Sequence, residues 1–421
     1  MCLSAELSRA LDSVAPSLDE RYQHSEVSTP YALRQLMLDA IPSEFWAEPH
    51  RVLEPCCGKG AFVIDIARRF LAAGLSERTV LEDCIFFQDI NADNVRATRA
   101  LLDPDERYAI NSRVGDALTI DWGHGFDAVI GNPPYNVNQR SRGNTPLYNL
   151  FIERYIDRCH YLLFVIPSRW FSGGKGLGRF RRRMLARRDI RLIEHVDDAR
   201  VWFPTVRIQG GVHFFLKDSD YSGPCHFNGV PVDLGRYDCV VKPALHSVID
   251  AVWHRPWRSL AVLAIPQSHF SIESNDVRLN ASDGPECFVS LSRARRLGSE
   301  GRVAHVRDYR ITDSCWKVIT TSAAHSAGSG FGFIAIAAPN QIHSKSYISF
   351  RCSDIDEARS LLSYLQTDFA NEMLAVRKMS QAVSTDTVRW IPLLPLDRIW
   401  TDRSVRAFIA NDPFDDRRAR N

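Results

Sequence analysis

At roughly 100–200 residues per domain, the 421 residues of this chain allow two to four domains. The composition is that of a soluble globular protein, with 45% hydrophobic and 24% charged residues, and a net charge of +2 gives no overall preference for a polyanionic partner. No apolar run reaches the roughly 18 residues of a membrane span, and the 10 cysteines form no zinc-type pattern, so we expect a cytoplasmic protein without a membrane anchor or a metal site.

The first part of the chain alternates between short apolar runs and helical patterns. After a polar lead-in over residues 1–25, Ser28 or Thr29 is placed to cap a helix that begins near Pro30. Predicted strands separated by helical segments then follow at 51–55, 84–90, 108–118, 127–132, 161–167, 190–196 and, as a closing strand or hairpin, 206–218. This alternation predicts an α/β fold with a mostly parallel sheet covered on both faces.

The alternation of predicted strands and helices ends at about residue 222. Residues 223–350 mix Pro, Gly, Ser and His with short β-like runs, and 355–374 have the pattern of one amphipathic helix. We therefore predict a first domain over 26–222 and a mixed α+β domain over 223–421.

Glycines and carboxylates stand at the ends of predicted strands. Gly58 and Gly60 lie between a strand and a helix, where the backbone can approach a ligand and helix N–H groups are free. The dinucleotide fingerprint G-x-G-x-x-G is absent because position 63 is valine, which disfavours NAD. Glu54 and the later strand-end acids would face the carboxyl edge of the sheet, where open α/β sheets bind ligands.

The three acids Glu54, Asp89 and Asp116 favour a zwitterionic ligand. A carboxylate beside free N–H groups would repel a pyrophosphate, whereas it suits an ammonium and a sulfonium. Asp89 is placed to accept ribose hydroxyls, and Asp116 to accept the amino group of an adenine. Taken singly, each acid is more simply a helix N-cap or a solvated loop residue, but their occurrence in strand order favours the ligand site.

The order of these segments resembles the amino-methyltransferases that use S-adenosylmethionine. The helix TPYALRQLML, the turn LEPCCGKGAF, the two aspartates and NPPY follow one another over residues 26–217. The LEP strand, NPPY and the additional C-terminal domain resemble in particular the gamma class of adenine-N6 DNA methyltransferases, which includes the TaqI methyltransferase and type II restriction–modification methylases. The resemblance implies a Rossmann-like S-adenosylmethionine-binding domain followed by a target-recognition domain.

The resemblance also implies roles for single residues. Thr29–Tyr31 would lie near the methionine part of the cofactor, Asp89 at its ribose and Asp116 at its adenine. Cys56 and Cys57 stand where the family often has Ala or Gly, and we interpret them as small fillers rather than nucleophiles. The expected cofactor-binding residues are Thr29, Tyr31, Glu54, Pro55, Cys56, Gly58, Gly60, Asp89, Ile90, Asp116, Ala117 and Asn132.

The stretch Asn132-Pro133-Pro134-Tyr135 ends a predicted strand with groups that suit an activated amine. The exocyclic amine of adenine is a poor nucleophile because its lone pair is delocalised into the ring. The Asn132 side-chain carbonyl and the Pro133 backbone carbonyl, held rigid by the two prolines, would accept its two N–H bonds. Alignment with the methyl donor then does most of the work, and no strong base is required.

A base can reach such a pocket only when it is flipped out of the duplex. Tyr135 would stack on the flipped base, and Phe203 would supply the second ring of the sandwich. The simpler alternatives are a strand-end turn for NPPY and ordinary core packing for Phe203.

Basic residues gather in 168–191, where Asp189 is the single acid. We predict phosphate contacts for this segment, and a solvated helix with internal ion pairs is the alternative. The segment 376–390 of the second domain is a weaker candidate for phosphate or base contacts. The predicted DNA-binding residues are Arg169, Lys175, Arg179, Arg181, Arg182, Arg183, Arg377, Lys378 and Gln381.

Together these features predict a site-specific adenine-N6 methyltransferase that acts on double-stranded DNA as the modification part of a restriction–modification system. We expect a monomer without a fused nuclease and with a separate cognate restriction endonuclease as a partner. The alternatives are a protein glutamine-N5 methyltransferase, whose amide poses the same nucleophile problem, an RNA adenine-N6 methyltransferase and a non-catalytic binding protein. Glutamine methyltransferases usually show a D-x-G-x-G-type first motif and lack a large C-terminal domain.

Overall fold

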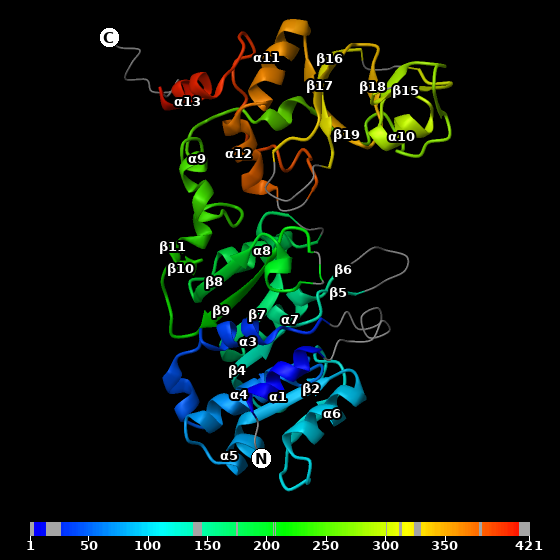
Figure 1. Cartoon of the computed structure of the whole chain (residues 1–421). Coiled ribbons are helices and arrows are strands. Elements are labelled where there is room, and N and C mark those ends of the chain that lie inside the picture. Colours follow the sequence, from blue (N-terminus) through cyan, green and yellow to red (C-terminus); the bar gives the residue numbers. More distant parts are fainter. Residues whose placement is uncertain are drawn as a thin grey trace. The chain divides into compact units, whose positions relative to one another are not determined.

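The computed structural model describes residues 4–13, 27–137, 145–173, 176–204, 206, 208–299, 301–310, 314–323, 330–378 and 381–411. The chain forms two compact units (Figure 1). Unit 1 is Met1–Trp170 with Gly174–Asp238, and unit 2 is Phe171–Gly173 with Cys239–Asn421. No helix within the described ranges has the length and apolar character to cross a membrane.

A sheet in the strand order β11-β10-β8-β9-β7-β4-β1-β2-β3 forms the centre of unit 1. All the strands predicted for this region are present. They are β1 (Val52–Glu54), β2 (Ile85–Asp89), β3 (Asn111–Val114), β4 (Phe126–Gly131), β7 (Cys159–Pro167), β8 (Ile190–Val196) and β9 (Val212–Asp218). Strands β3, β2, β1, β4 and β7 are parallel, and β9 closes the sheet as an antiparallel strand between β7 and β8.

The direction in which strands are added to the sheet reverses between β1 and β4. In open α/β sheets the crevice for a ligand lies at such a switch point, outside the carboxyl ends of the strands. Strands β1 and β2 are buried along their whole length, as is typical of parallel strands covered on both faces.

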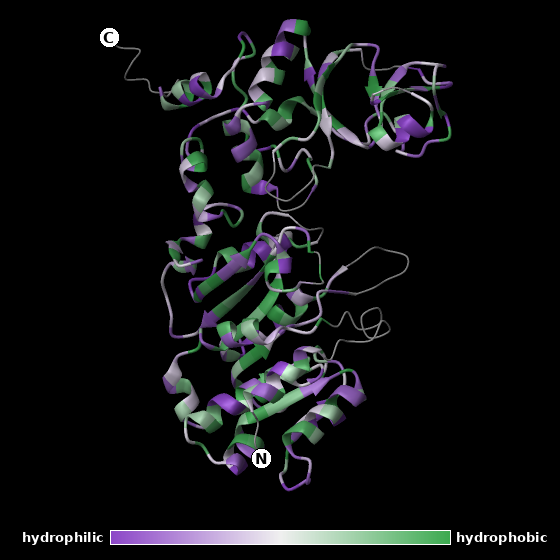
Figure 2. Ribbon diagram, in the orientation of Figure 1, coloured by the Kyte–Doolittle hydropathy of each residue, from purple (hydrophilic) through white to green (hydrophobic). Residues whose placement is uncertain are grey.

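Amphipathic helices cover the sheet. Figure 2 shows both hydrophobic and hydrophilic residues along α6, as expected of a helix with one buried face. The main helices of unit 1 are α3 (Tyr31–Leu38), α4 (Ala61–Ala72), α6 (Ala92–Leu102), α7 (Tyr148–Tyr155) and α8 (Gly178–Leu185). Its shorter elements are α1 (Ala5–Ala10), η1 (Leu11–Ser13), η2 (Ser43–Ala47), α5 (Glu77–Thr79), η3 (Val80–Cys84), β5 (Asn136–Val137), β6 (Thr145–Pro146), η4 (Ser168–Phe171), η5 (Ala199–Val201) and η6 (Leu234–Arg236).

The boundary between the units falls later than the one predicted at residue 222. The reason is the hairpin of β10 (Cys225–Phe227) and β11 (Val230–Val232), which pairs with β8 and so extends the sheet of unit 1. The end of the strand–helix alternation near residue 222 cannot reveal this pairing, because the partner strand lies earlier in the chain.

A fully buried arginine ties the N-terminal helix to unit 1. The Arg34 Nε atom donates to Asp65 Oδ2 at 2.6 Å, and Nη2 donates to the Ser8 carbonyl at 2.9 Å. Its Nη1 atom donates to Asp12 Oδ1 at 2.8 Å and to the Thr29 carbonyl. The network joins α1, η1, α3 and α4, and it holds Thr29 at the edge of the sheet. Removal of one partner of such a buried pair costs about 3–5 kcal/mol.

Unit 2 contains two four-stranded sheets, in the orders β12-β19-β16-β17 and β13-β15-β14-β18. Its strands are β12 (Ala264–Ile265), β13 (Leu279–Asn280), β14 (Glu286–Phe288), β15 (Val303–Val306), β16 (Trp316–Thr321), β17 (Ile334–Ala337), β18 (Ile342–His343) and β19 (Tyr347–Cys352). Its helical elements are η7 (Pro243–Leu245), α9 (His246–Asp250), η8 (Leu260–Leu263), α10 (Leu291–Arg296), α11 (Ile355–Leu365), α12 (Asp368–Arg377) and α13 (Asp402–Ala410).

The single helix predicted over 355–374 is wrong in one respect, because α11 and α12 are separate helices. The Thr367 side chain accepts a hydrogen bond from Ala370 N and so caps the start of α12. Threonine is a favoured N-cap residue, and the continuous apolar periodicity concealed this break.

Candidate active site

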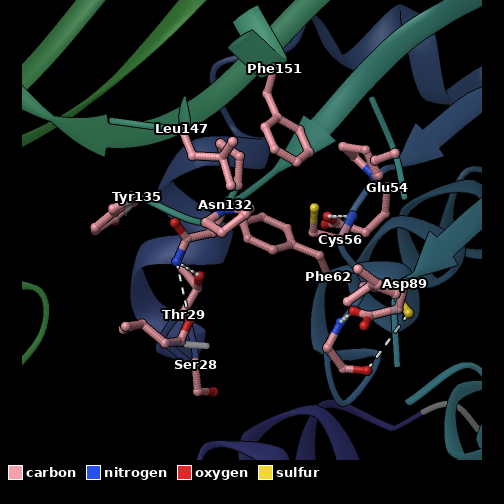
Figure 3. Close-up of a pocket in the computed structure, with 18 of the residues that line it drawn as sticks. Ser28, Thr29, Glu54, Cys56, Phe62, Asp89, Asn132, Tyr135, Leu147 and Phe151 are labelled. Carbon is pink, nitrogen blue, oxygen red and sulfur yellow. Dashed lines mark hydrogen bonds between the residues drawn. The ribbon is translucent and has the colours of Figure 1, made fainter. Parts of the chain in front are cut away.

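A cavity of about 400 Å³ opens at the carboxyl edge of the sheet of unit 1 (Figure 3). It brings together most of the side chains predicted from the sequence. The predicted residues that line it are Thr29, Glu54, Pro55, Cys56, Gly58, Asp89, Ile90, Asp116, Ala117, Asn132, Pro133, Pro134 and Tyr135. They come from the ends of β1, β2, β3 and β4 and from the segment before α3.

Glu54 is the last residue of β1 and is 2% exposed. Its Oε1 atom accepts a hydrogen bond from Cys56 N at 3.2 Å, and its buried Oε2 atom has no hydrogen-bond partner among the described residues. Burial raises the pKa of this carboxyl well above its usual value, and the Asp89 charge adds to the rise. Because buried polar atoms are normally paired, we expect the Oε2 atom to accept a hydrogen bond from a donor group of a bound ligand.

The raised pKa of Glu54 predicts a pH dependence of cofactor binding. An ammonium group binds the carboxylate and not the carboxylic acid, so binding should release a proton, and affinity should fall as the pH is lowered through the raised pKa. Calorimetry in buffers of different ionisation enthalpy measures the proton release. Glu54→Gln should bind more weakly and without this pH dependence, and an equal pH dependence in both proteins would contradict the assignment.

Asp89 is held at the end of β2 by two backbone donors. Gly58 N donates to its Oδ2 atom at 2.9 Å and Asn91 N to its Oδ1 atom at 2.8 Å. A carboxylate has room for further hydrogen bonds, so Asp89 is oriented and still able to accept a hydroxyl. The neighbouring Ile90 side chain is 59% exposed and lines the same cavity.

Asp116 caps a turn and also lines the cavity. Its Oδ1 atom accepts a hydrogen bond from Leu118 N at 2.9 Å, so it caps the turn that follows β3, and its exposed side chain lines the cavity. Ala117 is buried beside it.

Asn132 follows β4 directly, and its amide orientation is determined. Nδ2 donates to the Val27 carbonyl at 3.2 Å and to Thr29 Oγ1 at 3.0 Å, as Figure 3 shows. A backbone carbonyl only accepts hydrogen bonds, so the nitrogen and not the oxygen must face Val27. The Oδ1 atom is buried, and the described residues offer it no donor. Asn132 therefore presents an oriented acceptor to the cavity.

The Thr29 hydroxyl should contribute to catalysis through this orientation. Thr29→Val keeps the shape of the side chain and removes one acceptor of Asn132 Nδ2, and a hydrogen bond of this kind contributes about 0.5–1.5 kcal/mol. We expect kcat to fall by about two- to tenfold in Thr29→Val and to be restored in Thr29→Ser. A change confined to the KM for the cofactor would instead indicate the direct cofactor contact predicted from the sequence.

Tyr135 lies on the other side of Asn132 from Asp89 in Figure 3. It is 9% exposed, and burial raises the pKa of its hydroxyl, an effect that the Asn132 side chain partly offsets. Its carbonyl accepts from Leu147 N at 3.0 Å, and the short strand β5 after it pairs with β6. The NPPY stretch is thereby fixed on both sides.

Three residues predicted for the site do not line the cavity. Phe203 is 2% exposed, belongs to the hydrophobic core of unit 1 and does not line the cavity, so its stacking role stays a prediction. Gly60 does not line the cavity either; with φ +83° it lies against α6, where an added Cβ would be 2.7 Å from Thr98 Oγ1. Tyr31 instead contacts Arg9 and Arg34, whose guanidinium carbons are 5.0 and 5.7 Å from its ring centroid.

The Cys56 thiol, in the turn after β1, is not an activated nucleophile. Burial raises the pKa of the Cys56 thiol well above its usual value, and the charges of Glu54 and Asp89 raise it further. A protonated thiol is a weak nucleophile, which supports the interpretation of Cys56 as a filler. In the ranges that the structure describes, no group of three His, Cys, Asp or Glu residues is arranged to hold a metal ion.

Part of the lining had no motif in the sequence. Leu147 directly precedes α7 and Phe151 lies within it, and Figure 3 draws both among the residues that line the cavity. Their only sequence signal was helical periodicity, which shows that a residue is apolar but not which cavity it faces.

The basic segment 168–191 is partly neutralised. The charges of four arginines are paired: Arg183 and Arg187 with Asp157, Arg188 with Asp233, and Arg191 with Asp218. Arg169, Arg179 and Arg182 are exposed without a carboxylate partner among the described residues, Arg181 is half-buried, and Lys175 lies outside those residues. The surface charge of this segment is therefore smaller than its sequence indicates.

The predicted DNA contacts of Arg377 and Lys378 are wrong, because both side chains are buried in unit 2. Arg377 is 2% exposed, donates to Asp386 and lies 4.7 Å from the centroid of the Trp390 ring. Lys378 is 0% exposed, and burial lowers its pKa to about 8. Gln381 is exposed.

Residues 63–202 match the family model of the Eco57I restriction-modification methylase. The predicted resemblance to restriction–modification methylases is confirmed. The matched segment contains Asp89, Asp116 and the Asn132–Tyr135 stretch, whereas Glu54 lies before it.

Two further comparisons are with individual proteins, one curated relative and one solved structure. A Mycoplasma pneumoniae protein described as an uncharacterized adenine-specific methylase is 29% identical over 109 residues, which are 24% of this chain and 26% of that relative. The chain thus spans about a quarter of the length of this curated relative. The Type IIL restriction-modification enzyme MmeI, solved in complex with DNA, is 12% identical with a TM-score of 0.55 over 92% of this chain and 70% of the MmeI chain. At this identity the similarity concerns the fold alone, and it confirms the predicted Rossmann-like methyltransferase fold with an additional domain.

Proposed function

We propose that this chain transfers a methyl group from S-adenosylmethionine to the N6 amine of adenine at specific sites in double-stranded DNA. The observation that carries the proposal is the Asn132 amide. Its nitrogen is held by Val27 and Thr29, and its buried oxygen has no partner among the described residues and lines the same cavity as Glu54.

The residues of the cavity fit S-adenosylmethionine. The Glu54 Oε2 atom suits the ammonium of its methionine part, Asp89 suits ribose hydroxyls, and Asp116 with Ile90 suits an adenine. When bound, this cofactor supplies an electrophilic methyl group on a sulfonium. An acidic lining next to a backbone turn favours such a cation over a pyrophosphate.

The chain itself would orient and activate the amine. Asn132 Oδ1 and the Pro133 carbonyl would accept the two N–H bonds, which draws the nitrogen toward tetrahedral geometry and localises its lone pair. The proton leaves after methyl transfer, when the nitrogen is positively charged, so no strong base is needed. Positioning of this kind is a large source of rate acceleration.

Duplex DNA as the substrate is supported by the family match and by the exposed cations Arg169, Arg179 and Arg182. The adenine would have to leave the helix, and Tyr135 would stack on it. A cognate restriction endonuclease would be a separate partner.

Expression in a host that lacks N6-methyladenine tests the proposal. Nucleoside mass spectrometry of the host DNA should show N6-methyladenine, and long-read sequencing of the same DNA should give the recognised site. DNA without N6-methyladenine, together with methylated glutamine in release factors or N6-methyladenine in RNA, would replace the proposal with the corresponding alternative.

A further inference from the structure

A second cavity, of about 380 Å³, lies in unit 2 between its two sheets. One side is formed by the end of β16 and the start of β17 and β19, and the other by loops beside β14 and β15. The residues that matter for its chemistry are Ser274, Ser290, Arg302, Lys345, Ser346 and Tyr347.

Arg302 is half-buried in this cavity and is held in place by two aromatic residues. Its Nη1 atom donates to Tyr347 Oη at 3.4 Å, and its guanidinium carbon lies 4.7 Å from the centroid of the Phe333 ring. Tyr347 is itself fully buried and donates to the Val289 carbonyl at 2.9 Å. Because the guanidinium is already positioned, little further side-chain entropy is lost when it binds a ligand.

The charge of Arg302 is not compensated. No carboxylate pairs with it among the described residues, and the described lining of the cavity contains no acid. Lys345 adds a second cation, whose partner Glu273 lies outside the lining. The active-site cavity of unit 1, in contrast, is lined by the three acids Glu54, Asp89 and Asp116 together with Arg34 and Lys59.

Hydroxyl groups complete the lining. Ser274 and Ser346 share a hydrogen bond of 2.9 Å between their Oγ atoms, and the Ser290 hydroxyl caps α10. A positioned guanidinium is planar and donates several hydrogen bonds. Together with the surrounding hydroxyl groups it can bind several oxygen atoms of one phosphate group.

We propose that this cavity binds a phosphate group of the DNA backbone, with Arg302 as the main contact. The inference rests on the proposed function, because the phosphate is that of the DNA substrate. It replaces the phosphate contacts that the sequence predicted for the buried Arg377 and Lys378.

Salt-dependent DNA binding tests this site. Affinity for a duplex is measured over roughly 50 to 200 mM salt for wild type, Arg302→Ala and the control Arg403→Ala, which removes an exposed charge of unit 2 outside the cavity. Arg302→Ala should weaken binding equally for all DNA sequences and reduce the slope of log K against log salt by about 1. Arg403→Ala should leave both unchanged, and Arg302→Lys, which keeps the charge, should keep the slope.

Three results would overturn the inference. An unchanged slope in a folded Arg302→Ala protein would exclude a phosphate contact. A lost preference at one base position with the slope intact would mean that Arg302 reads a base. Inorganic phosphate that binds wild type but not Arg302→Ala, with equal DNA affinity of both, would make the occupant a free anion. The proposed function is tested separately by assaying the same wild-type preparation for methyl transfer to DNA. If the wild type does not methylate DNA, the proposed function fails, whatever the effect of Arg302→Ala on DNA binding.

Discussion

Alanine in place of Asn132 should abolish methyl transfer and leave cofactor binding largely intact. The Asn132 side chain presents one oriented acceptor, its Oδ1 atom, to the cavity. The amide is oriented because its Nδ2 atom donates to the Val27 carbonyl and to Thr29 Oγ1. Loss of one preorganised hydrogen bond to the reacting group costs about 10²–10³-fold in kcat. Single-turnover kinetics with a duplex substrate and calorimetric titration of S-adenosylmethionine measure the two effects separately.

Asn149 gives a matched control for this experiment. Its side-chain oxygen also lacks a partner within the described residues, but the residue stands on α7 outside the cavity lining. Asn149→Ala should retain methyl transfer. Undiminished transfer by Asn132→Ala would refute the role given to the amide, whatever its effect on cofactor affinity.

A methyl group at position 131 should weaken cofactor binding. Gly131 ends β4, and an added Cβ would lie 2.2 Å from Glu54 Oε1 and 2.7 Å from Oε2, which is far inside van der Waals contact. The Glu54 carboxylate would have to move away from position 131. Overpacking of this kind costs about 1–3 kcal/mol, so we expect Gly131→Ala to bind S-adenosylmethionine about 5–150-fold more weakly.

Gly125 supplies the control, because it precedes the same strand and an added Cβ there would lie 3.8 Å from the nearest atom, the Arg158 carbonyl oxygen. Neither glycine has a positive φ, so alanine causes no backbone strain at either position. Thermal melting shows whether both variants fold. Equal cofactor affinity in the two folded variants would mean that the Glu54 carboxylate is not part of the cofactor site.

The sequence was sufficient to predict the edge of the sheet and most of what lies there. Glu54, Asp89 and Asn132 each stand at or directly after a strand end, and parallel strands bring their carboxyl ends to one edge. Strand order along the chain therefore determined which polar side chains meet, without knowledge of tertiary contacts.

The errors arose where burial depends on residues far apart in the chain. Phe203 is an aromatic residue near the correct motif, but local sequence does not show whether a ring faces a cavity or the core. Arg377 ends α12 and Lys378 follows it, at a helix end where exposed cations are common, and Arg377 is buried with Asp386 and Trp390 as contacts. The cavity around Arg302 was missed for the same reason, because its lining comes from six separate segments.

The buried Arg34 network shows the same limit for stability. Its acids Asp12 and Asp65 are 22 and 31 residues away along the chain, so no local pattern links them to Arg34. The consequence is functional as well, because the same arginine holds the Thr29 carbonyl and thereby the segment that orients Asn132.

The most direct test of the central claim is transfer of an isotopically labelled methyl group from S-adenosylmethionine to purified, unmodified duplex DNA. After digestion, mass spectrometry should find the label in N6-methyladenine with wild type and find none with Asn132→Ala. Label in another nucleoside, or no label in DNA from wild-type protein that binds the cofactor, would contradict the account.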